Sequence, residues 1–310
     1  MPEEKKENGR SSLQQKQINS ATLIHCEPGT IDKAEFQHTV LCQTCLPYSN
    51  PGEAPIWKQN QGSVSLAVQT TKIFNPVTKD YDFVGLPYGP KARLLLSHFN
   101  TEAIKTQSKD IHVKDSMTSF IKSMGFDTNG RTVKSVKDQL RRLSTSIISL
   151  GYTEDGKTGV QVNLQIVKGF DLPPDNIYQK SLWPGYIRLT DDYFNSLLNH
   201  AIPLDQRALR ALANNAMALD IYAWLTQRLH RIPISRPQFI AWAVMWEQFG
   251  SSYVRIDKFK MVFRHTLSIV KLQYLDARIE EVKNRGFNLY SSPPPITRTS
   301  ISLTGIDVLK

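Results

Sequence analysis

The sequence is poor in cysteine and has no apolar run long enough to cross a membrane. Its 310 residues include only three cysteines, and this small odd number suits a reducing compartment rather than a disulfide framework. No hydrophobic stretch approaches the roughly 18 residues that a membrane-spanning helix needs. The N-terminal residues are polar and lack the apolar core of a secretory signal. We therefore expect a cytoplasmic protein with no membrane partner.

Motifs for metal binding and catalysis are also scarce. Cys42 and Cys45 form a C-x-x-C pair, and with Cys26 and His38 upstream they offer four groups for a tetrahedral zinc site. A single pair without a second paired motif is a weak zinc signal, and the surrounding segment reads as an apolar strand. The seven histidines include no H-E-x-x-H spacing, and no G-x-S-x-G motif marks a nucleophile. We expect no metal, no cofactor and no catalytic residue, and so not an enzyme.

One segment does match a catalytic pattern, because Gly151–Thr158 has the G-x-x-x-x-G-K-T spacing of a phosphate-binding loop. Such a loop works only when a buried strand enters it and a helix leaves it, so that backbone N–H groups and the helix dipole converge on phosphate. Here a helical pattern continues to Leu150, an alternating segment follows at 160–166, and Glu154 and Asp155 place two negative charges inside the loop. We interpret the segment as a polar turn of a hairpin and expect no nucleotide binding.

Charge of one sign is in excess. The chain carries 38 Lys and Arg against 28 Asp and Glu, a formal net charge of +10. Such an excess favours a polyanionic partner, nucleic acid first and an anionic membrane surface second. The hydrophobic fraction of 40% suffices for ordinary cores, and the length allows about two domains.

The N-terminal half reads as three helices followed by a β-hairpin. Residues 1–35 are polar and aperiodic, which predicts a disordered arm. A strand is expected at 64–74, a first helix follows it, and a second helix ends at Gly125. Apolar residues between Val133 and Leu150 recur every three or four positions and predict a third helix. This order is typical of a winged helix.

The C-terminal half repeats the order. A helix carrying Trp242 and Trp246 ends near Gly250, and a long helix then presents an apolar face between Ile256 and Tyr274. We expect Trp224, Trp242 and Trp246 to fill the core rather than to stack on bases. A hairpin that turns at Asn284–Gly286 closes the unit as a second wing.

These patterns predict an α+β fold, mostly helical, with two tandem winged-helix domains that carry small β wings. The predicted divisions are a disordered polar arm at 1–35, an N-terminal winged-helix domain at 36–172, a C-terminal winged-helix domain at 173–296 and a tail at 297–310.

The predicted partner is double-stranded DNA. Cations on a helix and an adjacent wing can span a groove and its phosphates together, and Arg can also make a bidentate contact to guanine. The predicted DNA-binding residues lie on the outer face of the third helix of each unit and at the tip of the second wing. They are Arg131, Lys134, Arg141, Arg142, Arg255, Lys258, Lys260, Arg264, His265, Lys271, Lys283 and Arg285. The alternative is that each basic stripe is only a solvated helix face.

The C-terminal helix is the stronger candidate of the two. Between Tyr253 and Tyr274 it has five Lys or Arg and a single acid, Asp257, whereas the N-terminal helix carries Asp138 on its outer face. We expect the C-terminal unit to supply most of the site-specific affinity. The N-terminal unit would add phosphate contacts or pair protomers.

Several long segments are distinctive, among them "VGLPYGPKARLLLSHFNTEAIKTQS", "DSMTSFIKSMGFDTNGRTVKSVKDQLRRLS", "AMALDIYAWLTQRLHR" and "EQFGSSYVRIDKFKMVFRHTL". Together they resemble the RepA-type initiators of plasmid replication, from about residue 40 to residue 296. The resemblance implies a non-enzymatic protein that binds repeated sites at a plasmid origin, helps to open the duplex and recruits a host replication initiator and the replicative helicase. It also implies paired winged helices, and it leaves monomer and homodimer both open.

Two other classes of function remain. A transcriptional regulator could use the same DNA-binding units, and repeated sites at an origin would distinguish an initiator from it. A strand-nicking initiator would need a nucleophilic Tyr near a metal-binding His cluster, and the sequence shows no such cluster.

Overall fold

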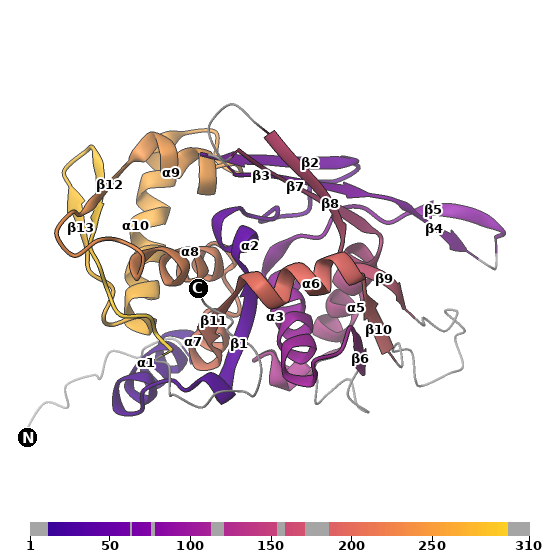
Figure 1. Cartoon of the computed structure of the whole chain (residues 1–310), viewed down its shortest axis with the longest axis horizontal. Helices are drawn as coiled ribbons and strands as arrows, with labels where there is room; N and C mark the ends of the chain where they lie inside the picture. Colours follow the sequence, from indigo (N-terminus) through magenta and orange to yellow (C-terminus); the bar gives the residue numbers. More distant parts are fainter. Residues whose placement is uncertain are drawn as a thin grey trace, which may run out of the picture.

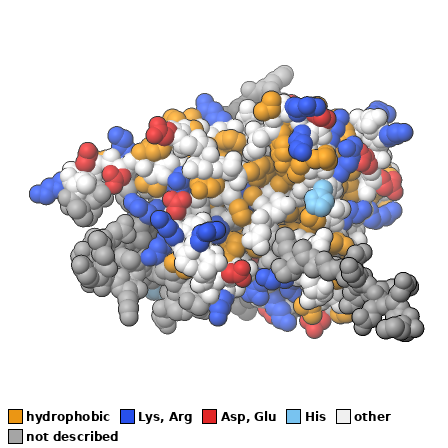
Figure 2. Space-filling view, turned by 180° about the vertical axis from the view of Figure 1, so that it is seen from behind, with side chains coloured by type: hydrophobic (Ala, Val, Ile, Leu, Met, Phe, Trp, Pro, Cys, Tyr) orange, Lys and Arg blue, Asp and Glu red, His pale blue; other side chains and the backbone are white. Residues whose placement is uncertain are grey.

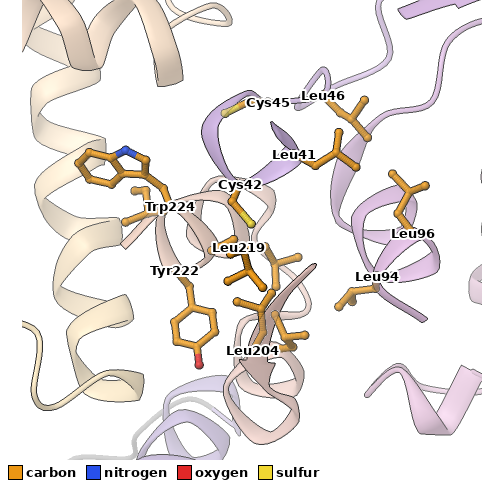
Figure 3. Packing of buried hydrophobic residues seen from close by; sticks show 14 of the residues in the cluster. Leu41, Cys42, Cys45, Leu46, Leu94, Leu96, Leu204, Leu219, Tyr222 and Trp224 are labelled. Atoms are coloured by element: carbon orange, nitrogen blue, oxygen red, sulfur yellow. The ribbon is translucent and has the colours of Figure 1, made fainter. Parts of the chain in front are cut away.

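Two long helices, α3 (Gly89–Thr106) and α8 (Ala216–Leu229), form the centre of the core, and most of their side chains are buried. The computed structural model describes residues 12–62, 64–75, 78–112, 121–153, 159–170 and 186–296. Buried residues from both halves of the chain form a hydrophobic cluster, in which Cys42 and Trp224 lie among Leu side chains of several elements (Figure 3). The fold is mixed α/β with small antiparallel sheets.

The N-terminal half surrounds α3 with short strands and one amphipathic helix. Its elements are β1 (Ala34–His38), α2 (Thr39–Gln43), β2 (Ile56–Gln61), β3 (Val64–Thr70), β4 (Lys72–Asn75), β5 (Asp80–Phe83), β6 (Asp110–His112), α5 (Gly130–Ser144), β7 (Ser146–Thr153), β8 (Gly159–Gln165) and β9 (Val167–Phe170). A four-stranded sheet has the order β2-β3-β7-β8, and β4 pairs with β5 in a hairpin that projects from the molecule (Figure 1). The amphipathic helix α5 packs against α3 through buried Val136, Leu140 and Leu143.

The C-terminal half consists of helices around α8 and one three-stranded sheet. Its elements are β10 (Tyr186–Leu189), α6 (Asp191–His200), β11 (Ala201–Asp205), α7 (Gln206–Leu212), α8, β12 (Gln238–Ala241), α9 (Trp242–Phe249), α10 (Ile256–Gln273), β13 (Ile279–Val282) and β14 (Gly286–Leu289). The sheet has the order β12-β14-β13. Strands also join the two halves, since β11 pairs with β1, and β10 lies between β6 and β9.

A buried ion pair also connects the halves. Arg93 on α3 donates from Nε to Asp220 Oδ1 at 2.6 Å and from Nη2 to Asp220 Oδ2 at 2.7 Å. Asp220 lies on α8, and both side chains are less than a tenth exposed. The guanidinium also donates to the backbone oxygens of Leu46, Pro47 and Gly89. The pair therefore holds α3, α8 and the chain after α2 in one arrangement.

The prediction of a disordered arm is wrong for residues 12–35. This segment contains helix α1 (Ser12–Cys26) and a 3-10 turn at Ile31–Lys33, and α1 packs against α7 and α10. Arg207 on α7 donates to the carbonyl oxygens of Leu23 and Glu27, and Gln273 Nε2 on α10 donates to Gln17 O at 2.9 Å. Hydrogen bonds from distant residues hold this polar helix, so its own sequence carries little apolar periodicity. Residues 1–11, the tail at 297–310 and the predicted domain boundary after residue 172 lie outside the described residues.

The predicted helix up to Leu150 is too long. Helix α5 ends at Ser144, and Ser146–Thr153 forms strand β7, which pairs with β3 and β8. A strand therefore enters the loop, not a helix as predicted. The hairpin is confirmed, because β8 and not a helix follows, so the loop lacks the helix that would bind phosphate. The loop residues 154–158 themselves lie outside the described part of the chain.

The two cysteines of the C-x-x-C pair are core residues. Cys42 lies in α2, where a strand was predicted, and both Cys42 and Cys45 are buried. Burial raises the pKa of both thiols, which keeps them protonated at neutral pH. Within the described residues no group of three His, Cys, Asp or Glu is placed to hold a metal ion. None of the described helices is long and apolar enough to cross a membrane.

His38 caps helix α2 in its neutral form. Its Nδ1 accepts from the backbone N–H of Val40 at 3.3 Å, and its Nε2 lies 3.0 Å from Ser196 Oγ. Since Nδ1 accepts a hydrogen bond, the ring proton is on Nε2. Burial lowers the pKa of His38 to about 4, with a smaller contribution from His200, because a charged imidazole would lose its hydration there.

Removing one partner of the buried ion pair should destabilise the protein strongly. Asp220→Ala leaves the Arg93 guanidinium buried without a counter-charge, so we expect the free energy of unfolding to fall by about 3–5 kcal/mol. Urea denaturation measures this loss. The matched control is Asp257→Ala, which removes the exposed pair with Arg255 and should leave stability almost unchanged. Equal losses from both variants would contradict the role given to Asp220.

Protonation of His38 should destabilise the fold in acid. The unfolded state binds a proton near pH 6.5 and the folded state only near pH 4, so the stabilisation is complete above pH 6.5 and is lost as the pH falls towards 4. The predicted contribution to the loss is about 3 kcal/mol. Urea denaturation from pH 7.5 to pH 4 should show a shallower pH dependence for His38→Asn, and an unchanged one for the exposed His112→Asn. The same slope in wild type and His38→Asn would show that another group causes the acid loss.

Candidate nucleic-acid interface

The C-terminal module, defined as β12, α9, α10, β13 and β14, buries one face of α10 completely. Phe259, Phe263 and Val270 on α10 are at most 1% exposed. Phe263 meets Trp242 of α9 and Phe287 of β14, with ring centroids 5.6 and 5.9 Å apart. The prediction that Trp224 and Trp242 belong to the core is confirmed, while Trp246 is partly buried against it. Aromatic packing thus holds the inner face of α10 against α9 and the sheet.

The outer face of α10 presents an exposed ridge. Its members recur every three or four residues, so they form one line along the helix. They are Lys258, Met261, His265, Ser268 and Leu272. Only Lys258 carries a permanent charge, and the others offer a hydrogen-bonding group or an apolar surface. Such a mixed ridge can meet the donors, acceptors and methyl groups of base edges in a major groove.

The remaining predicted cations of α10 lie beside the ridge and have partners. Lys260 and Arg264 lie over the Trp242 ring, at 5.5 and 5.0 Å from its centroid. Arg264 also bridges to the wing, with its Nη2 2.7 Å from Glu281 Oε1, and this hydrogen bond raises the pKa of Arg264. Arg255 pairs with Asp257 at 2.7 Å, whereas Lys271 is exposed near the end of the helix. Lys260 and Arg264 therefore help to position α10 against Trp242 and the wing.

The hairpin β13–β14 places Lys283 and Arg285 at an exposed tip. Asn284 has φ of 61°, a left-handed conformation that Asn adopts more readily than most residues. Gly286 lies so close to β12 that an added Cβ would be 2.0 Å from Ile240 O. The Arg285 guanidinium lies 5.5 Å from the centroid of the Phe239 ring, so the wing tip is in contact with β12.

A groove lined by arginines lies beside β12, and sequence reasoning missed it. Arg228, Arg231 and Arg236 line a space of about 530 Å³ together with Gln238, Phe239 and neighbouring residues. The signal in the sequence was the dense basic run "QRLHRIPISR" between two helices. The run alone does not predict a groove, because only the folded chain places the end of α8 next to β12. Seen from behind, Lys and Arg side chains are spread over this face of the molecule, and Asp and Glu side chains lie among those at the end that carries the C-terminal module (Figure 2).

The predicted cations of the N-terminal half lie on α5, which is towards the opposite end of the molecule from α10 (Figure 1). Arg131 and Lys134 are exposed, while Arg141 is half-buried. Arg142 is mainly structural: it donates to Leu86 O, pairs with Asp138 at 2.9 Å and lies over the Tyr88 ring. The predicted DNA-binding residues of α5 and those of α10 therefore lie far apart in the structure (Figure 1). The ion pair with Arg142 also partly neutralises the charge of Asp138.

Two solved structures share the fold of this chain. Crystal structures of domains 2 and 3 of RctB are similar to it: a selenomethionine derivative has a TM-score of 0.51 at 8% identity and covers 82% of this chain and 99% of that chain. A second has a TM-score of 0.50 at 10% identity and covers 81% of this chain and 94% of that one. At such low identity these likenesses show the fold alone. A search of curated proteins found no significant match.

The family comparison extends over more than half of the sequence. Residues 86–248 match the model of the plasmid-encoded RepA protein, in its RepA_C region. The matched range includes both partners of the buried ion pair and all but the last residue of α9, the first helix of the C-terminal module. The resemblance to RepA-type proteins is thus confirmed, and the chain belongs to the plasmid-encoded RepA family of replication initiators.

Proposed function

We propose that this protein initiates plasmid replication by binding repeated double-stranded sites at the origin, without catalysing a reaction itself. It would then promote opening of the duplex and recruit a host replication initiator and the replicative helicase. Membership of the RepA family supports this role. The observation that carries the DNA-binding step is the exposed ridge of α10, which stands beside a basic hairpin and whose opposite face is fully buried.

The C-terminal module has the parts that a winged helix uses on DNA. Helices α9 and α10 would act as the helix-turn-helix, with the ridge of Lys258, Met261 and His265 in the major groove. Lys283 and Arg285 on the wing would contact phosphates or the minor groove alongside. Phosphate contacts would position the module on the duplex, and contacts of the ridge to base edges would recognise the DNA sequence.

Helix α5 would have a smaller part in DNA binding. Its exposed cations Arg131 and Lys134 could contact phosphates of a second segment of the site, or α5 could pair two protomers. Arg142 would not contribute, because its guanidinium is already engaged with Leu86, Asp138 and Tyr88. We therefore expect the exposed cations of α10 and the wing to contribute more to DNA affinity than those of α5.

Two double variants test the ranking with cations that are exposed. We expect Lys258→Ala with Lys283→Ala to weaken origin binding more than Arg131→Ala with Lys134→Ala. Because Lys283 of the first pair would contact phosphate and Lys258 a base edge, the slope of log affinity against log salt should become shallower by about 1. Fluorescence anisotropy on an origin duplex at several salt concentrations measures both quantities.

Circular dichroism should first show that both variants are folded. A larger loss from the pair on α5 would reverse the ranking. A wild-type slope near zero would contradict electrostatic binding to duplex DNA altogether.

A further inference from the structure

The groove beside β12 is a concave cationic surface. Among the described residues that line it there are three arginines, three glutamines and no acid. No described carboxylate forms an ion pair with Arg228, Arg231 or Arg236 in the structure. Like charges gathered in one hollow repel one another, and an anionic ligand would relieve that repulsion.

Arg228 is the fixed member of the three. It is half-buried at the end of α8, its guanidinium lies 5.7 Å from the Trp224 ring centroid, and its Nε donates to Gln238 Oε1 at 2.9 Å. Burial lowers its pKa, which reports an unfavourable desolvation of the cation. Arg231 and Arg236, by contrast, are exposed at the rim.

The groove continues into the wing. Phe239 lines the groove, is 42% exposed and lies under the Arg285 guanidinium at the wing tip. Strand β12 is an outer strand of its sheet, paired on one side with β14 only. A basic strip therefore runs from Lys283 and Arg285 along β12 to Arg236 and Arg231.

We propose that this groove binds the phosphodiester backbone of duplex DNA immediately beyond the segment held by α10 and the wing. The inference rests on the proposed function and deepens it, because it assigns a flanking contact that the winged-helix parts do not supply. Guanidinium groups match phosphate oxygens in pairs, and each phosphate contact releases counterions. An acidic peptide would also fit the charge, but the continuity of the groove with the wing favours the backbone of the same DNA.

The test compares two duplexes. One ends with the footprint of the wing, and the other extends by about one helical turn on each side. We expect Arg231→Ala with Arg236→Ala to weaken binding of the extended duplex by roughly fivefold or more, and to reduce its salt slope by about 2. Binding of the short duplex should stay within about twofold of wild type. The pair Arg231→Gln with Arg236→Gln should behave alike, and urea denaturation should show that both variants are folded.

The matched control is Lys72→Ala with Lys105→Ala, which removes the same charge from exposed sites on β4 and α3. It should affect both duplexes equally and only slightly. If the arginine variants bind both duplexes with the wild-type affinity and slope, the groove is not a DNA site. Loss of plasmid replication by such variants would then assign it to an acidic protein partner. If the wild-type protein binds neither duplex, the proposed function itself fails.

Discussion

The buried pair of Arg93 and Asp220 is the constraint on which the arrangement of the two halves depends. Every N–H group of a buried guanidinium needs an acceptor, and here Asp220 and three backbone oxygens supply them. These acceptors come from α8, from the chain after α2 and from the first turn of α3. The Arg93 side chain also lies over the Tyr48 ring. The three segments must therefore meet at one place before the charge can be buried.

That constraint fixes the position of the DNA-binding candidate. Helix α8 contains Asp220 in its second turn and Arg228 in its last turn, so the same helix carries one partner of the ion pair and one wall of the basic groove. Helix α9 is held from the other side, because Gln59 on β2 donates to Gln248 O, and Gln248 Nε2 donates to Gln43 O at 2.8 Å. Helix α1 supports α10 from behind through Gln17. The exposed ridge on the outer face of α10 takes no part in these contacts, so it is accessible to a ligand.

Elements that are determined by their own local sequence could be predicted. The apolar face of α10 and the hairpin at Asn284–Gly286 follow from helical spacing and from a turn that needs Asn and Gly. The C-terminal end of α5 could not be predicted, because the spacing of Ile147 and Leu150 fits a helix and a strand equally well. Pairing of Leu150 with Leu66 and of Ile148 with Val68 decides for the strand.

Features made by residues far apart in the sequence also escaped prediction. Arg93 and Asp220 are separated by 127 positions, and nothing local marks them as partners. Helix α1 is polar, and its contacts with Arg207 and Gln273 exist only in the folded chain. For the candidate site, the ridge of α10 and the wing were predictable, whereas the restraint of Arg264 by Glu281 and the groove beside β12 were not.

Hydroxyl-radical footprinting of the full-length protein on the plasmid DNA that flanks its gene tests the central claim most directly. The account predicts several repeats of one sequence, each with protected sugars along the backbone on either side of a major groove, and with protection that weakens as salt rises. Protection of a single promoter site would instead indicate a transcriptional regulator. The absence of any sequence-specific protection would contradict the account.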